Sequence, residues 1–115
     1  MIKYLLAAVI LAVIDFPWLW YQVDNYRSVF KKVQGGREVE FRLWPAIPVY
    51  AGLSYLLVNC KSVQQAALTG IASYAVYDFT NLAVLKDYTV GIAVQDTIWG
   101  GVLFAAAFTV LKTIA

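Results

Sequence analysis

The sequence has no histidine and one cysteine, Cys60, among its 115 residues. A single cysteine excludes a disulfide within the chain, and the lack of histidine removes a residue on which most zinc sites and serine or cysteine catalytic pairs depend. No phosphate-binding loop or nucleophile–base pair is present either. The sequence therefore favours a protein that is not an enzyme and predicts no cofactor, while the question of a metal ion stays open.

Charge is also scarce, because only 14% of the residues are charged, against about 25% in soluble domains. The net charge of +2 is too small to indicate a nucleic-acid partner. Apolar residues make up 62% of the chain, and the mean hydropathy is +0.68. A soluble fold of this size could not bury so much apolar surface, and a disordered chain would be rich in charge instead. The composition predicts an integral membrane protein, with residues 1–115 forming a single membrane-embedded domain.

Charged residues divide the chain into four apolar stretches. Each is close in length to the about 20 residues that a helix needs to cross about 30 Å of hydrocarbon. Barrel strands are not expected, because the apolar runs do not alternate at every second residue. We expect an all-α, polytopic membrane protein, an antiparallel bundle of four transmembrane helices. The predicted helices cover residues 3–22, 43–59, 63–85 and 89–112.

The only long connection, residues 24–42, contains a segment with helical spacing of apolar residues. Its apolar positions are Tyr26, Val29, Phe30 and Val33, and its basic positions are Arg27, Lys31 and Lys32. This pattern predicts a short amphipathic helix between the first two transmembrane helices, lying in the lipid headgroup layer. The alternative is a helical extension of the first transmembrane helix into water.

The distribution of lysine and arginine predicts an orientation. Residues 24–42 and 86–88 carry six basic residues, whereas both termini and residues 59–62 together carry three. The positive-inside rule then places the long loop on the cytoplasmic side and both termini on the opposite side of a multi-pass protein. The other connections are short, so consecutive helices should pack as antiparallel neighbours.

Three aspartates, Asp15, Asp78 and Asp96, lie within predicted transmembrane helices. By position along their helices, all three fall within roughly 7 Å of the bilayer midplane, toward the side of the long loop. A carboxylate at that depth costs on the order of 2.5–3.5 kcal/mol, so the three side chains should converge inside the bundle instead of facing lipid. We expect them to form one shared site.

Aromatic and amide side chains lie one helical turn from each aspartate. They are Trp18, Trp99, Tyr74 and Asn81. With Asp15, Asp78 and Asp96, these residues form the candidate site for a proton, a cation or a polar ligand. The alternative is that they are neutral hydrogen-bonding groups that hold the helices together.

Small residues predict close helix packing in the second half of the chain. Gly100 and Gly101 are adjacent, and Ala66 and Gly70 lie four residues apart, one turn along a helix. Such residues let two membrane helices approach closely.

Three motifs resemble those of a known protein family. Residues 74–86 read YAVYDFTNLAVLK, residues 15–19 read DFPWL and residues 96–100 read DTIWG. They are similar to the YAxYDxTNLAxL, DxxWL and DxxWG signatures of the domain of unknown function 2177 family of small predicted membrane proteins. The resemblance implies four transmembrane helices and no established activity, and it implies that the motif aspartates matter to the family.

Two functions from different classes follow from these observations. The first is a small binding or transport module for a proton, cation or polar solute that uses the intramembrane acidic cluster. The second is a non-catalytic accessory or architectural subunit of a larger membrane assembly. The expected partners are the lipid bilayer and other membrane subunits or further copies of the chain.

Overall fold

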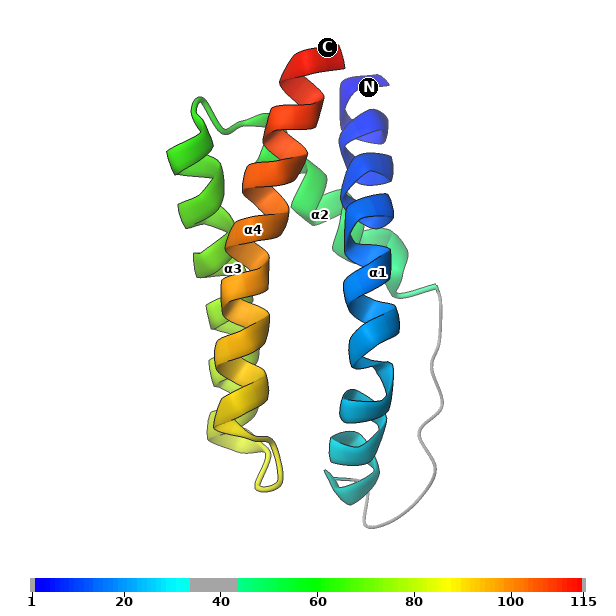
Figure 1. Ribbon diagram of the computed structural model, residues 1–115, viewed down its shortest axis with the longest axis vertical. Coiled ribbons are helices and arrows are strands. Elements are labelled where there is room, and N and C mark those ends of the chain that lie inside the picture. Colours follow the sequence, from blue (N-terminus) through cyan, green and yellow to red (C-terminus); the bar gives the residue numbers. More distant parts are fainter. Residues whose placement is uncertain (1, 34–43, 115) are drawn as a thin grey trace.

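The computed structural model describes residues 2–33 and 44–114, all of them helices or short connections (Figure 1). The described residues form four helices and no strand. These are α1 (Ile2–Val33), α2 (Ala46–Val58), α3 (Val63–Val84) and α4 (Val90–Ile114). The predicted all-α class is therefore confirmed.

Helix α4 packs against both α1 and α3, whereas α1 and α3 do not pack against each other within the described residues. The molecule is elongated, 46 Å long and 25 by 21 Å across. Both termini lie at one end, together with the connection between α2 and α3, and the connection between α3 and α4 lies at the other end (Figure 1). Consecutive helices α3 and α4 are antiparallel, as their short connection predicts.

Helix α1 is longer than the predicted first helix, because it continues to Val33. Residues 24–33, which were predicted to form the short amphipathic helix, are helical, and they form the last turns of α1 without a break. No glycine or further proline lies between Pro17 and Val33, so nothing in this part of the sequence ends the helix. The apolar side chains of that amphipathic segment and the rest of the loop, residues 34–42, lie outside the described residues.

Helix α2 is shorter than the predicted second helix, with 13 residues. At 1.5 Å per residue it reaches about 20 Å, less than the about 30 Å of a hydrocarbon core. Pro45 precedes its first residue and Pro48 lies in its first turn, where proline is tolerated. Two of the described helices are long and apolar enough to cross a membrane, over Ile2–Gln22 and Val90–Ile114.

Side-chain hydrogen bonds define where α3 and α4 begin. The Ser62 hydroxyl accepts the backbone N–H of Gln65 at 3.0 Å, and the Gln65 side chain accepts the backbone N–H of Lys61 at 2.8 Å. This is close to a capping box, in which two otherwise unpaired donors are satisfied. Similarly, the Thr89 hydroxyl accepts the backbone N–H of Ile92 at 3.1 Å. These caps allow the short turns that bring the helices side by side.

The close approach of α3 and α4 depends on three glycines. A methyl group at Gly70 would collide with the Gly100 carbonyl, and one at Gly100 would lie 2.6 Å from the Gly70 carbonyl oxygen. A methyl group at Gly101 would lie 2.7 Å from Cγ1 of Ile71. The predicted close packing at these glycines is confirmed, because no larger residue fits there.

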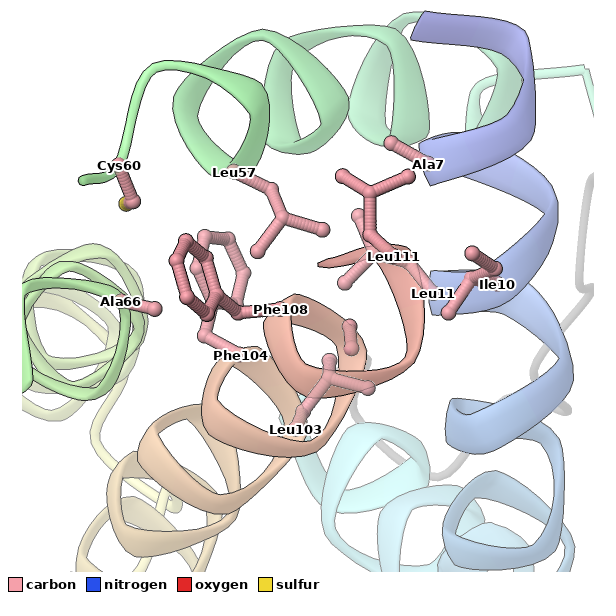
Figure 2. Packing of buried hydrophobic residues seen from close by; sticks show 11 residues of the cluster. Ala7, Ile10, Leu11, Leu57, Cys60, Ala66, Leu103, Phe104, Phe108 and Leu111 are labelled. Carbon is pink, nitrogen blue, oxygen red and sulfur yellow. The ribbon is translucent and has the colours of Figure 1, made fainter. Parts of the chain in front are cut away.

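The main apolar core is formed by residues of all four helices (Figure 2). Its largest fully buried members are Phe104, Leu11, Leu57 and Leu103. The outer surface is apolar as well, since Trp20, Ile47 and Val76 are each at least 70% exposed. An apolar exterior of this kind is unusual for a water-soluble monomer and suits contact with lipid.

Candidate functional site

Asp15 is held by donors from two other helices. Its carboxylate on α1 accepts the Tyr50 hydroxyl of α2 at 2.7 Å on Oδ2 and the Trp99 indole N–H of α4 at 2.7 Å on Oδ1. Asp15 is only 5% exposed. Each oxygen of this buried carboxylate therefore has a neutral donor, and one side chain connects three helices.

Trp18, expected from its spacing to be a donor near Asp15, has a different neighbour. Its ring stacks on the ring of Trp99, with centroids 5.0 Å apart and planes 9° apart. Its indole nitrogen is buried and has no hydrogen-bond partner among the described residues. Trp18 thus supports Trp99 by packing, and Trp99 makes the hydrogen bond to Asp15.

Asp78 is fully buried on α3, with 0% exposure. Its Oδ1 accepts the hydroxyl of Tyr88 at 2.7 Å, while no donor among the described residues reaches its Oδ2. The carboxyl of Asp96 on α4 lies within hydrogen-bond reach of Asp78. Two ionised carboxylates present only acceptors to each other, so such a bond requires a proton on one of them. We call Asp78 and Asp96 the carboxyl pair.

Tyr88 is the donor in the connection between α3 and α4, and it is buried. Burial raises the pKa of the Tyr88 phenol well above its usual value, and the hydrogen bond to Asp78 raises it further. The phenol therefore stays neutral and remains a donor. The Asn81 side chain lies within hydrogen-bond reach of Tyr88 and also of Tyr77, so it joins the same group from one turn beyond Asp78.

Tyr74 lies on the other side of Asp78 along α3. Its ring would be 2.5 Å from a methyl group at Gly100, and it packs against the apolar core. It therefore contacts the close crossing of α3 and α4. The sequence placed Tyr74 with the aspartates only because it lies four residues before Asp78.

Helix α4 connects the two acidic positions of the site, which are Asp15 and the carboxyl pair. Asp96 belongs to the carboxyl pair, and Trp99, three residues later on the same helix, donates to Asp15. The charge of Asp96 also acts on Asp15. A further contact lies toward the loop end, where the Gln22 amide donates to the Gln95 side-chain oxygen at 3.2 Å. The predicted aspartates thus occupy the interior between α1, α3 and α4.

Two tyrosines in this site were missed by the sequence reasoning. Neither Tyr50 nor Tyr88 was predicted as a site residue. Neither lies within one turn of Asp15, Asp78 or Asp96 in the sequence, so local spacing carried no signal for them. Among the described residues, no group of three or more cysteine, histidine or carboxylate side chains could hold a metal ion.

Apolar helices, a lipid-compatible exterior and buried carboxylates define a helical membrane protein. The model of the domain of unknown function 2177 family, described as "predicted membrane protein", matches residues 1–113. The chain belongs to this family. The resemblance carried by the three sequence motifs is therefore confirmed. None of the curated proteins and none of the solved structures compared with the chain matches it.

Proposed function

We propose that the protein is a small membrane module that binds or transports a proton, a cation or a polar solute at Asp15, Asp78 and Asp96. The observation that carries the proposal is the environment of Asp78. This side chain is fully buried and its Oδ1 accepts from Tyr88, while its Oδ2 has no donor among the described residues and the carboxyl of Asp96 lies near the side chain.

An acidic pair in such a place needs a positive partner. A buried, unpaired carboxylate is costly, and two adjacent carboxylates cannot both stay ionised without compensation. A proton shared between Asp78 and Asp96 would satisfy the Oδ2 atom of Asp78. A bound cation would do the same, with carboxylate oxygens and the Asn81 amide oxygen as ligands. Both kinds of ligand are exchangeable, which is what binding or transport requires.

The two acidic positions have different roles in this proposal. Both oxygens of Asp15 already accept hydrogen bonds from neutral donors, so Asp15 holds α1, α2 and α4 in place. In the carboxyl pair, the Oδ2 atom of Asp78 has no donor among the described residues, so this pair is the exchangeable part. Trp99 donates to Asp15 and Trp18 stacks on Trp99, while Asn81 lies one turn beyond Asp78 and Tyr74 packs at the crossing of α3 and α4.

We also propose that the four helices cross the bilayer as an antiparallel bundle, which is the even number of crossings that two termini on one side require. Residues 24–42 would then lie on the cytoplasmic side and both termini on the opposite side, as the count of basic residues predicts. The position of both termini at one end of the molecule supports this arrangement (Figure 1).

The alternative function is that of an accessory or architectural subunit in a larger membrane assembly or homo-oligomer. One observation favours it: the hydrogen bonds at Asp15 join three helices through neutral donors, which is how polar groups stabilise membrane bundles. In that case the carboxyl pair would be a further structural contact between α3 and α4.

The test compares Asp78→Asn with the unmodified protein in sealed vesicles. Asparagine keeps the volume of aspartate but cannot ionise, so the variant should insert and purify normally while proton or cation flux, or binding of the solute, is lost. Asp87→Asn is the matched control, because Asp87 is exposed in the nearby connection. Asn81→Leu should weaken the same activity by removing an oxygen. If proton, sodium and potassium flux and solute binding are the same for Asp78→Asn as for the unmodified protein, the accessory-subunit function is favoured, and Asp78→Leu should then impair assembly.

A further inference from the structure

Among the described residues, the end of the molecule that holds the termini carries basic side chains without nearby acidic ones. Lys3, Lys61 and Lys112 all lie there and are exposed. Of the three lysines, Lys3 has the nearest acidic residue along its own helix. That residue is Asp15, about 18 Å away at 1.5 Å per residue. This separation exceeds the about 8–10 Å over which charges act at physiological ionic strength. A ligand at this end is therefore expected to be anionic.

Two of these lysines line a small pocket of about 100 Å³. Lys3 comes from the first turn of α1 and Lys112 from the last turns of α4, and Leu57 of α2 and Phe108 and Leu111 of α4 provide apolar walls. Figure 2 shows these three apolar residues directed toward one another between α2 and α4. Since a water molecule takes up about 30 Å³, the pocket has room for a small polar group but not for a whole organic ligand.

The Lys112 ammonium is oriented by a neighbouring ring. Its Nζ lies 5.6 Å from the centroid of Phe108, within the range of a cation–π contact. This contact holds the charge beside the apolar wall of the pocket. The pocket thus combines an apolar wall with two ammonium groups, which is the pattern expected for an amphiphile with an anionic head.

In the proposed topology, the pocket also lies at the level where lipid headgroups are found. Ile2–Gln22 and Val90–Ile114 are both long and apolar enough to cross the bilayer, and the pocket lies where the first begins and the second ends. Lysines at helix ends extend toward the headgroup layer.

We propose that this pocket binds the phosphate group of an anionic phospholipid, with Lys3 and Lys112 as its cationic partners. The proposal is independent of the carboxyl pair, which lies toward the opposite end of the molecule.

The experiment measures lipid retained by the full-length protein by native mass spectrometry after release from nanodiscs of phosphatidylcholine with phosphatidylglycerol. The unmodified protein should retain one phosphatidylglycerol in preference to phosphatidylcholine. The double variant Lys3→Gln, Lys112→Gln should lower this affinity about 30-fold, which is about 2 kcal/mol at about 1.4 kcal/mol per tenfold. Lys61→Gln, the matched control, removes a charge at the same end but outside the pocket and should retain the lipid.

A second readout uses Cys60, the only cysteine, which lies in the wall of the pocket. Phosphatidylglycerol should slow alkylation of Cys60 in the unmodified protein and in Lys3→Arg, Lys112→Arg, but not in the double glutamine variant. Retention of the lipid by that variant would overturn the proposal, as would an equal loss in Lys61→Gln. If inorganic phosphate alone binds with the same dependence on Lys3 and Lys112 and displaces the lipid, the ligand is a free phosphate and the lipid assignment is wrong.

Discussion

The indole rings of Trp18 and Trp99 stack 5.0 Å apart at an angle of 9° and join α1 to α4. Each tryptophan ends an Asp-x-x-Trp motif, Asp15 to Trp18 on one helix and Asp96 to Trp99 on the other. The two motifs meet but are not equivalent, because Trp99 donates to Asp15 while the Trp18 indole nitrogen has no partner among the described residues. The similarity of the motifs in sequence therefore covers two different roles.

This difference predicts different effects for matched substitutions. Trp99→Phe keeps an aromatic ring but removes the donor to Asp15, so it should lower the free energy of unfolding by about 1–3 kcal/mol. Trp18→Phe removes an N–H that makes no hydrogen bond to the described residues and should cost clearly less. Reversible unfolding in mixed detergent micelles measures both values. Equal losses for the two variants would show that the hydrogen bond to Asp15 contributes little.

The crossing of α3 and α4 predicts a sharp dependence on residue size. Gly70→Ala and Gly100→Ala should each destabilise the protein by about 2 kcal/mol or more, because the added methyl group overlaps the facing helix. Gly52→Ala is the control, since no atom lies within 4 Å of a methyl group there. That change should stabilise α2 by roughly 0.5–1 kcal/mol through helix propensity. A destabilised Gly52→Ala, or a neutral Gly70→Ala, would contradict this packing.

The buried phenol of Tyr88 predicts a dependence of stability on alkaline pH. Because its pKa is raised in the folded protein, the contribution of Tyr88 is complete below the ordinary tyrosine pKa of about 10 and is lost as pH rises through the folded value. Tyr88→Phe should cost about 1–2 kcal/mol at neutral pH and reduce the loss of stability above pH about 10. Tyr21→Phe serves as an exposed control, and unfolding measured from pH 7 to 11 tests the difference.

The proposed topology predicts which positions a membrane-impermeant thiol reagent can reach. In a Cys60→Ala background, Lys61→Cys and Ala115→Cys should be labelled from one side of sealed vesicles. Gly36→Cys and Asp87→Cys should be labelled from the opposite side. Labelling of Lys61→Cys and Asp87→Cys from the same side would show that α3 does not cross the membrane.

The order and approximate positions of the helices could be predicted because charge and hydropathy are local properties. The limits of α1 and α2 could not. Helix α1 continues through residues 24–33 because that segment has no residue that ends a helix. The predicted end of the membrane-spanning segment near Asp24 does not interrupt the backbone hydrogen bonds of the helix. Helix α2 begins only after Pro45, which removes a backbone donor and restricts the residue before it.

The aspartates of the site could be predicted from the sequence, but the tyrosine hydroxyl groups that donate hydrogen bonds to them could not. An aspartate in an apolar helix is conspicuous in any sequence, and all three are buried in the structure. The donors Tyr50 and Tyr88 lie 35 and 10 residues from the carboxylates they contact. Their positions depend on how helices cross and where a turn folds back, which local spacing does not encode. Spacing instead favoured Trp18 and Tyr74, which lie one turn away from an aspartate and serve in packing.

The position of α4 between two helices that do not pack against each other has a mechanical consequence. Asp96 and Trp99 lie on successive turns of one rigid helix, so a small slide or rotation of that helix displaces both together. A shift that separates Asp96 from Asp78 also moves the Trp99 donor relative to Asp15. If a ligand binds the carboxyl pair as proposed, its binding and the packing of α1 against α4 are therefore coupled through α4.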